Sequence, residues 1–295
     1  MIIVKAIGII LASVLLICAG TAGYVLLLMR KRPPLFLYEL RRKEPDFLPL
    51  EQIPPLQIQM IITQEDCGFY SHPGYDIQSI RQARKMLFRK KRIVFGGSTI
   101  TQQLAKNLYF RFDKSFLRKA AELLIALRLE HDLGKNRILE LYVNIIYFGN
   151  GVYGLRDAAR FYFNKDVSEL SLNQMVILSI IPPAPTAGNP IQHPEVFERR
   201  RNWKLRCFTI CKPPLITPEE EADIRSHDAA HLDPELRKPD DFTQSYPQTI
   251  PMINERFGRF FGSARHPGRK RPTDICACKA RKGSGECALG KNKMK

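Results

Sequence analysis

Apolar positions along the chain recur mostly at helical spacing. Within residues 116–129 they fall three or four positions apart, which predicts an amphipathic helix. These positions are Leu117, Ala120, Ala121, Leu124 and Ile125. Residues 138–146 repeat the pattern, and residues 170–181 form an apolar run that stops at Pro182-Pro183. Strand-like alternation is scarce, so the pattern predicts a mainly α protein.

Helix starts can be placed from capping signals. Thr99 followed by Gln102 resembles a capping box, so a helix is expected to open directly after Gly96-Gly97-Ser98. A Thr217-Pro218-Glu219-Glu220 run combines a cap, a proline and an acidic first turn, which predicts another short helix.

The N-terminal segment is apolar over its whole length. Residues 6–29 contain no charged side chain, and 24 helical residues extend about 36 Å, enough to cross a hydrocarbon core of about 30 Å. A cleaved signal peptide is the rival interpretation. Its apolar core usually has about 7–15 residues, so the longer run here favours a retained transmembrane helix.

Flanking charge bears on the topology of this helix. Lys5 precedes the apolar run, whereas Arg30, Lys31 and Arg32 follow it. The positive-inside rule taken alone would place the C-terminal body in the cytoplasm. This cytoplasmic placement conflicts with the function that the sequence motifs indicate.

Overall composition limits the class of protein and its partners. The chain of 295 residues has room for one full domain with extensions, and 44% hydrophobic residues suit a packed core. Its net charge of +17 suits an acidic partner, such as anionic lipid, a phosphorylated substrate or nucleic acid. Residues 265–295 hold ten Lys or Arg against two acids, which predicts a disordered basic tail that contacts membrane or other polyanions.

The seven cysteines do not form a common zinc pattern. Cys276, Cys278 and Cys287 lie together in the basic tail. We expect free or bridged thiols there and no metal site, and the pairing of any disulfides stays open.

Two stretches carry the strongest candidate chemistry. The first is Glu65-Asp66-Cys67-Gly68-Phe69-Tyr70-Ser71-His72-Pro73-Gly74-Tyr75-Asp76, and the second runs from Gly96 to Asn107. A carboxylate in the first is a candidate base. Hydroxyls and unpaired N–H groups at the predicted helix start in the second offer a natural place for phosphate. Together they predict a site that can displace a phosphate leaving group.

Taken with three later motifs, these stretches resemble the peptidoglycan glycosyltransferases, which occur as monofunctional transglycosylases and as N-terminal domains of bifunctional penicillin-binding proteins. The resemblance covers roughly residues 55–225. The later motifs are Arg118-Lys119-x-x-Glu122, then Lys135-x-x-Ile138-Leu139-Glu140-x-Tyr142-x-Asn144, then Gly149, Gly151, Gly154, Ala158, Ala159, Tyr162 and Phe163. Any one motif alone would be a weak signal, whereas five in order make a strong one.

The resemblance implies a fold and a division of the chain. The fold would be a lysozyme-like, two-lobed and mainly α domain behind an N-terminal transmembrane helix. We expect a membrane anchor over 1–32, a juxtamembrane linker over 33–54, the glycosyltransferase domain over 55–232 and a basic C-terminal extension over 233–295.

The resemblance also implies roles for individual residues. Glu65 would be the base that deprotonates the 4-hydroxyl of lipid II, and Glu122 the second acid, near the leaving group. Substrate-binding roles fall to Ser98, Thr99, Gln103, Lys106, Asn107, Lys114 and Arg118. Position 114 is Lys where the family usually has Arg, so a point charge replaces a bidentate fork. Supporting roles fall to Asp66, Phe69, His72, Gly74 and Asp76.

Each of these residues also has a plain structural explanation. Glu65 and Asp66 could be an exposed acidic pair or a helix cap, and Glu122 could form an ordinary i,i+4 ion pair with Arg118. The second motif could be a Gly-capped helix with solvated polar side chains. Glu140 and Asn144 are expected to be structural partners, and Gly149, Gly151 and Gly154 to permit a tight turn.

The predicted function is polymerisation of lipid II into β-1,4 glycan, with inversion and release of undecaprenyl diphosphate. Mg²⁺ or Mn²⁺ is expected to arrive with the pyrophosphate, without a metal site of protein ligands. No Ser-x-x-Lys or Lys-Thr-Gly occurs, so no transpeptidase activity is expected. Alternatives are a lysozyme-like peptidoglycan hydrolase or lytic enzyme and a non-enzymatic membrane scaffold.

Partners and location follow from the same resemblance. We expect lipid II, the growing lipid-linked glycan, the membrane and further cell-wall synthesis proteins as partners, and no nucleic acid. The chain would be a single-pass protein of the bacterial cytoplasmic membrane. Its catalytic domain would lie on the periplasmic side, against the charge bias around the apolar helix.

Overall fold

The structure, a computed structural model, describes residues 2–81, 97–110 and 116–226. In this part the chain is mainly α-helical with one two-stranded sheet, as predicted. The basic tail with its three cysteines lies outside the described residues, and so does Lys114. Of the remaining cysteines, Cys18 is an exposed free thiol.

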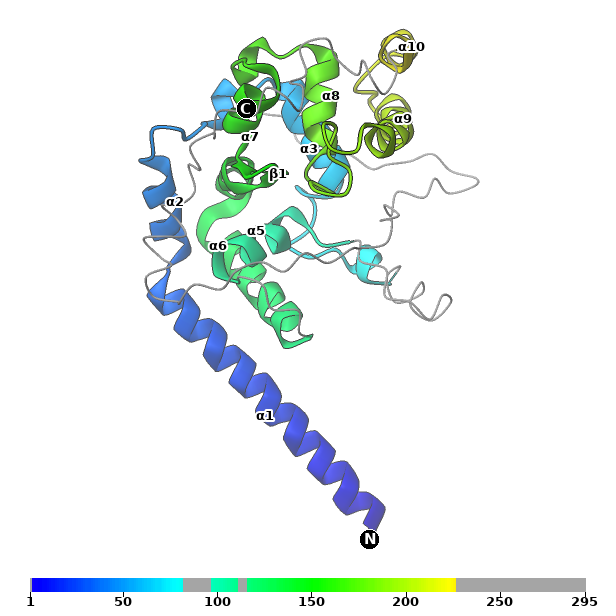
Figure 1. Cartoon of the computed structure of the whole chain (residues 1–295). Coiled ribbons are helices and arrows are strands. Elements are labelled where there is room, and N and C mark those ends of the chain that lie inside the picture. The colour runs from blue at the N-terminus through cyan, green and yellow to red at the C-terminus, as the bar shows by residue number, and fades with distance from the viewer. Residues whose placement is uncertain (1, 82–96, 111–115, 227–295) are drawn as a thin grey trace.

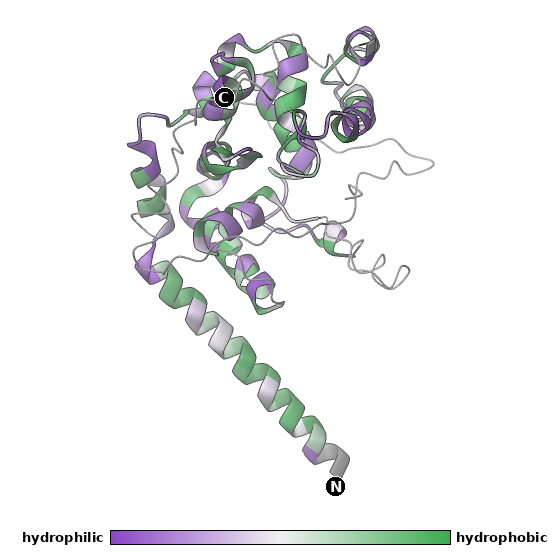
Figure 2. Cartoon of the chain, viewed as in Figure 1, coloured by the Kyte–Doolittle hydropathy of each residue, from purple (hydrophilic) through white to green (hydrophobic). Residues whose placement is uncertain are grey.

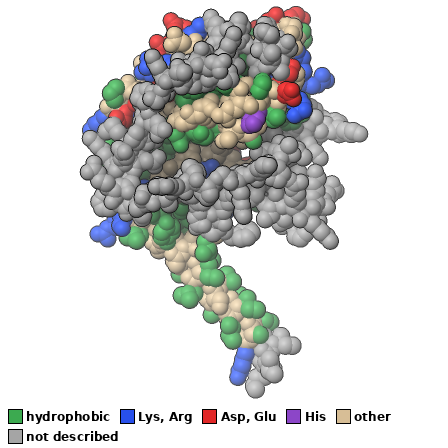
Figure 3. All heavy atoms as spheres, in the orientation of Figure 1, with side chains coloured by type: hydrophobic (Ala, Val, Ile, Leu, Met, Phe, Trp, Pro, Cys, Tyr) green, Lys and Arg blue, Asp and Glu red, His purple; other side chains and the backbone are tan. Residues whose placement is uncertain are grey.

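Helix α1 (Ile2–Lys31) projects from the rest of the molecule as one long rod (Figure 1). It is apolar along most of its length (Figure 2), and its large side chains, such as Leu15 and Leu16, are exposed. Figure 3 shows hydrophobic side chains along the face of the rod in view. By length and composition, α1 is the one helix of the described residues that could cross a membrane.

The predicted linker contains a packed helix. Helix α2 (Pro34–Arg42) buries Leu37 and Tyr38, and the helix packs on α6 (Phe116–Ile145). The Tyr38 hydroxyl donates to Glu140 Oε2 at 2.5 Å. Asn144 Oδ1 accepts from the Leu48 backbone N–H at 2.7 Å. Glu140 and Asn144 therefore hold the segment after α1 against the domain, as structural partners.

The helices form two packed groups. Helix α5 (Ile100–Tyr109) packs on α6, as do α1 and α2. Helix α3 (Pro55–Glu65) packs on α8 (Leu172–Ile180) and α9 (Pro194–Ile210), with α10 (Pro218–Ser226) behind α9. Helix α7 (Leu155–Phe163) contacts both α6 and α8 and so joins the groups. This agrees with the two-lobed part of the prediction, and the lysozyme-like part stays a prediction.

The range of α6 contains two helical halves, in agreement with the two helices that the sequence predicts for this region. A kink at Gly134, where φ is 71°, separates its halves. Ala121 and Ile125 of the first half are buried, whereas Leu117 and Leu124 are 54% and 39% exposed. The predicted apolar face of this half is therefore only partly covered by protein.

Two short 3-10 helices and a hairpin complete the described part. The 3-10 helices are η1 (Leu50–Gln52) and η2 (Val167–Glu169). Strands β1 (Tyr147–Gly149) and β2 (Val152–Tyr153) pair antiparallel, with Tyr147 opposite Tyr153. Gly149, Gly151 and Gly154 all have positive φ, which confirms the predicted tight turn.

Candidate active site

Glu65 is the last residue of α3, at the point where this buried helix ends. The helix begins after Pro54 with a proline in its first turn and continues through the buried residues Met60, Ile61 and Ile62. Its C-cap, Asp66, has φ −164° and ψ 76°, which terminates the helix. The packing of α3 therefore fixes the backbone position of Glu65.

The Glu65 carboxylate is held by one neutral donor. Gln103 Nε2 of α5 donates to Glu65 Oε2 at 2.8 Å. Glu65 Oε1 is buried and has no hydrogen-bond partner among the described residues. Burial raises the pKa of Glu65, and the Gln103 hydrogen bond and the Lys204 charge partly oppose this effect. A carboxylate with a raised pKa and one oxygen that has no hydrogen-bond partner among the described residues is suited to accept a proton.

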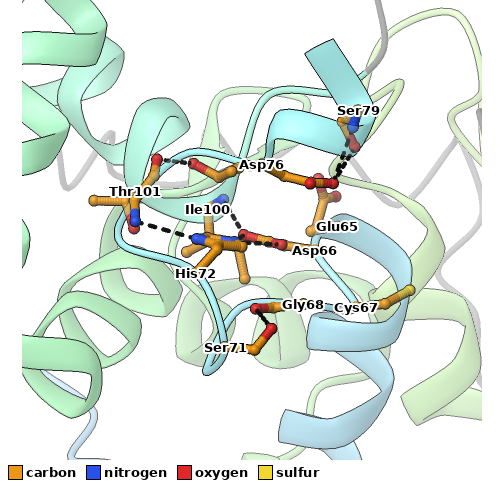
Figure 4. Close-up of polar contacts among 12 residues, drawn as sticks. Glu65, Asp66, Cys67, Gly68, Ser71, His72, Asp76, Ser79, Ile100 and Thr101 are labelled. Atoms are coloured by element: carbon orange, nitrogen blue, oxygen red, sulfur yellow. Dashed lines mark hydrogen bonds and ion pairs between the residues drawn. The ribbon is translucent and has the colours of Figure 1, made fainter. Parts of the chain in front are cut away.

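Asp66 connects the first motif to the start of α5. Its side chain is 6% exposed, and His72 Nε2 lies 2.8 Å from Asp66 Oδ1. The Ile100 backbone N–H donates to Asp66 Oδ2 at 3.0 Å, and Figure 4 shows both contacts. Asp66 is therefore not part of an exposed acidic pair. It fixes the chain beside Glu65, and we call Glu65, Asp66, His72 and Gln103 the base region.

Further contacts hold the loop that follows. The Thr99 hydroxyl donates to the Gly74 carbonyl at 2.7 Å. Gly74 has φ +90°, and a Cβ there would lie 2.9 Å from Glu130 Cγ, so glycine suits both the conformation and the space. Asp76 accepts from the Gln78 N–H at 2.8 Å and from the Ser79 hydroxyl (Figure 4). These residues support the loop without contacting the Glu65 carboxylate.

Phe69 and Lys135 complete this support. Phe69 is fully buried, and the Lys135 ammonium lies 4.6 Å from the centre of its ring. Lys135 Nζ also donates to the His72 carbonyl at 2.7 Å. The fourth motif therefore braces the first.

The start of α5 does not offer the expected free donors. Thr99 and Gln102 form a complete capping box, and the Ile100 N–H is taken by Asp66. The prediction of unpaired N–H groups at this helix start is therefore wrong for Thr99, Ile100 and Gln102. An acidic side chain of the same protein already uses the positive end of the helix. Only the capping part of the prediction is confirmed.

A second group of charges surrounds Glu122. This side chain is almost fully buried in the first half of α6. Arg118 Nε lies 3.0 Å from Glu122 Oε1, and Lys119 Nζ lies 2.9 Å from Oε2. Lys119 Nζ also donates to the Ser98 hydroxyl at 2.8 Å. The i,i+4 ion pair that the sequence allowed is present, within a larger cluster that includes Ser98.

Lys106 links the two groups. Its side chain is exposed, yet desolvation lowers its pKa, and Arg118 and Lys119 add to this effect. Glu122 and Glu65 both act in the opposite direction. Lys106 therefore lies within electrostatic reach of both carboxylates. We call Ser98, Lys106, Arg118, Lys119 and Glu122 the cation region, in which three cations face one carboxylate.

The predicted substrate-binding residues of the second motif lie in different surroundings. Gln103 and Lys106 lie on α5 beside Glu65, and Asn107, one turn after Gln103, is exposed. Thr99 is 2% exposed and its hydroxyl is engaged within the protein. The role predicted for Lys114 lies outside the described residues.

Two contributions were missed from the sequence. Lys119 was quoted in the third motif but not assigned, although its i,i+3 spacing to Glu122 was a usable signal. The charge of Lys204 on α9, distant in the sequence, lowers the pKa of Glu65. Its signal was a lysine at an apolar position of a helical repeat.

Comparisons with known proteins identify a family. A family model described as transglycosylase matches residues 35–208. Penicillin-binding protein 1F of Bacillus subtilis is 45% identical over 158 residues, which are 53% of this chain and 22% of that protein. Penicillin-binding protein 1A of Aquifex aeolicus is 42% identical over 174 residues, or 59% and 24%. Penicillin-binding protein 4 of B. subtilis is 36% identical over 210 residues, or 71% and 32%. The aligned part of the chain therefore spans about a fifth to a third of the length of these relatives.

Proposed function

Because the chain belongs to the transglycosylase family, we propose that it is a membrane-anchored peptidoglycan glycosyltransferase that joins lipid II units into a β-1,4 glycan. One observation carries the proposal. Helix α5 joins the two regions, because Gln103, which donates to the Glu65 carboxylate, lies one helical turn before Lys106. Ser98, directly before the N-cap of this helix, accepts a hydrogen bond from Lys119 of the cation region. A base and an anion site are therefore close enough to act on one substrate.

The proposed reaction uses these two regions at opposite ends of one displacement. The 4-hydroxyl of the acceptor attacks the anomeric carbon of the donor, and a new C–O bond forms there. The proton of the attacking hydroxyl passes to Glu65 Oε1, the oxygen without a hydrogen-bond partner among the described residues. The bond from the anomeric carbon to the pyrophosphate oxygen breaks, and the electron pair leaves with undecaprenyl diphosphate. Attack opposite the leaving group inverts the anomeric centre, as in an inverting glycosidase with a sugar hydroxyl in place of water.

The cation region would stabilise the charge that develops on the leaving group. Arg118 and Lys119 are held by the Glu122 carboxylate, so they need little rearrangement when the substrate binds. Lys106 is free of a direct carboxylate contact among the described ion pairs and is exposed to an incoming anion. Fixed cations beside a departing anion lower the barrier most when they are already in place.

A divalent cation remains part of the proposal. Among the described residues, no group of three His, Cys, Asp or Glu side chains could hold a metal ion. Mg²⁺ or Mn²⁺ would therefore arrive bound to the pyrophosphate and would supply further charge neutralisation there. The protein steps above do not depend on it.

The proposed location is the periplasmic side of the bacterial cytoplasmic membrane. Helix α1 would keep the domain beside substrates whose lipid tails stay in the bilayer, although Arg30, Lys31 and Arg32 follow the apolar run. Two reporters fused after Lys295, one active only outside the cytoplasm and one only inside, test the assignment. Activity of the inside reporter alone would reverse it.

Polymerisation of lipid II by the purified full chain tests the function itself. We expect glycan polymer with one undecaprenyl diphosphate released for each glycosidic bond formed, and no peptide cross-links since the transpeptidase motifs are missing from the sequence. Glu65→Gln should slow the reaction by about 10²–10⁴-fold with lipid II binding largely retained, and Glu51→Gln, at an exposed carboxylate, should not. Shortening of existing glycan without polymer would instead support the hydrolase alternative.

A further inference from the structure

Helix α9 carries two cations at core positions. Its buried residues recur at the spacing of one helix face. They are Phe197, Arg201, Lys204, Leu205 and Phe208. Arg201 is 0% exposed and Lys204 is 3% exposed. An apolar side chain would be the ordinary occupant, because burying an ammonium group costs free energy unless negative charge lies near it.

The end of α3 supplies such a charge. Helix α9 packs against α3, whose last residue is Glu65. The charges of Lys204 and Arg200 on α9 both lower the pKa of the Glu65 carboxyl group, and Lys204 lowers it more. The Arg200 guanidinium already donates to the carbonyls of Ile180 and Gly188. Lys204 is therefore the main cation from this side.

Other charged groups also face Glu65. Asp66 on the same segment disfavours a second negative charge. From α5, Gln103 donates a neutral hydrogen bond and Lys106 adds an attractive charge. From α6, Tyr142 lies within reach, and burial raises its pKa well above the ordinary value, so it stays neutral. Lys106 belongs to the exposed cation region, whereas Lys204 is shielded from solvent and ions.

We propose that Lys204 is a positioning residue for the reaction, whose buried ammonium keeps the Glu65 carboxylate in the ionised form that accepts a proton. This proposal rests on the proposed function of Glu65 as base. Burial alone favours the neutral carboxyl group, which is far too weak a base to take the proton of an incoming alcohol. A buried cation is weakly screened by salt, so its effect persists when substrate binding excludes water from the site.

The pH dependence of kcat/KM tests this proposal with the full chain in detergent and lipid II as substrate. In Lys204→Met the acidic limb of the profile should move upward by about one pH unit, with about tenfold lower kcat/KM on that limb. Activity at the alkaline end should be retained. Lys204→Arg keeps the charge and should restore the position of the limb.

Arg206→Met is the matched control. It removes a cation from the same helix at an exposed position, and it should leave the limb where it is in the wild type. An unmoved limb in folded Lys204→Met would overturn the proposal. If that variant does not fold, Lys204→Gln provides a second neutral side chain, and the same two outcomes apply to it.

A direct titration separates this proposal from the proposed function. The carboxyl carbon of Glu65, labelled with ¹³C and assigned by its absence in Glu65→Gln, can be followed by NMR without any turnover. Its titration midpoint should move upward in Lys204→Met and stay in place in Arg206→Met. If the wild type makes no polymer but the midpoint moves, the function fails and the electrostatic role stands. An unmoved midpoint overturns the role.

Discussion

The two carboxylates of the site, Glu65 and Glu122, are both buried but lie in opposite surroundings. Glu65 has one hydrogen bond from a neutral amide and one oxygen without a partner. Glu122 contacts a cation on each oxygen, Arg118 and Lys119. Both Glu122 oxygens are therefore occupied by cations of the protein, whereas one Glu65 oxygen has no protein partner. The difference separates a residue with an oxygen left for a substrate proton from one that holds cations in place.

The base region and the cation region also differ in rigidity and exposure. The base region is tied together by hydrogen bonds between segments far apart in the sequence, such as Asp66 with Ile100. The cation region has exposed members, and Lys119 is 49% exposed at its side chain. A base must be aimed within a few tenths of an ångström, whereas a site for a lipid-linked pyrophosphate has to admit and release it. Rigid and open surroundings suit these two tasks.

Exchange of each acid for its amide is the strongest test of this contrast. Glu65→Gln removes the proton acceptor, so the rate of polymerisation should fall by about 10²–10⁴-fold with donor KM little changed. Glu122→Gln leaves Arg118 and Lys119 with a weaker partner, so donor KM should rise and the rate should fall less. Steady-state kinetics with lipid II measure both. Equal losses in kcat and equal KM values would show that the two carboxylates act alike.

Loss of a cation should have a smaller effect. Lys106→Ala removes an exposed charge from the cation region, and we expect about a tenfold higher donor KM, which corresponds to about 1.4 kcal/mol. Lys43→Ala, at an exposed lysine of the α2 C-cap, is the control for a general loss of positive charge. An unchanged donor KM in Lys106→Ala would remove this residue from the pyrophosphate site.

The caps and turns of the site were predictable from the sequence, whereas its contacts between distant segments were not. The capping box at Thr99 and Gln102 and the loop glycine Gly74 leave local signals, because their roles depend on neighbouring residues. The use of the Ile100 N–H by Asp66 joins positions 34 residues apart. No local pattern encodes such a contact, so the free helix start was a wrong expectation.

Long-range packing explains the other differences. The segment 33–54 contains Pro and charge at a level that suggested a linker, yet Tyr38 packs with Glu140, 102 residues away. Lys204 is a similar case, because its apolar position in α9 indicates burial but not which helix packs against it.

A cap substitution should have a modest effect on stability and on the base region together. Thr99→Val removes the hydroxyl that accepts from the Gln102 N–H and donates to the Gly74 carbonyl. The free energy of unfolding should fall by about 1 kcal/mol. Turnover should fall with donor KM unchanged, since α5 carries Gln103. Thr99→Ser keeps the hydroxyl and should behave as the wild type in thermal unfolding and kinetics, and a raised donor KM in Thr99→Val would instead place Thr99 in the substrate site.

The smallest expected effect is a pH-dependent stability difference caused by Glu65. The folded protein raises the pKa of Glu65 above its ordinary value of 4.5, mainly by burial. Between the ordinary and the raised pKa, the folded state binds a proton that the unfolded state has released, so stability falls as pH rises through this window. Glu65→Gln lacks this loss. Its advantage in unfolding free energy over the wild type should therefore be small below pH 4.5, grow through the window and level off above it.

Denaturant unfolding at several pH values measures the difference, with Glu51→Gln as an exposed control that should track the wild type. An advantage that shrinks as pH rises would mean that the Glu65 site favours the charged form, and the contrast between the two carboxylates would then lie in their partners alone.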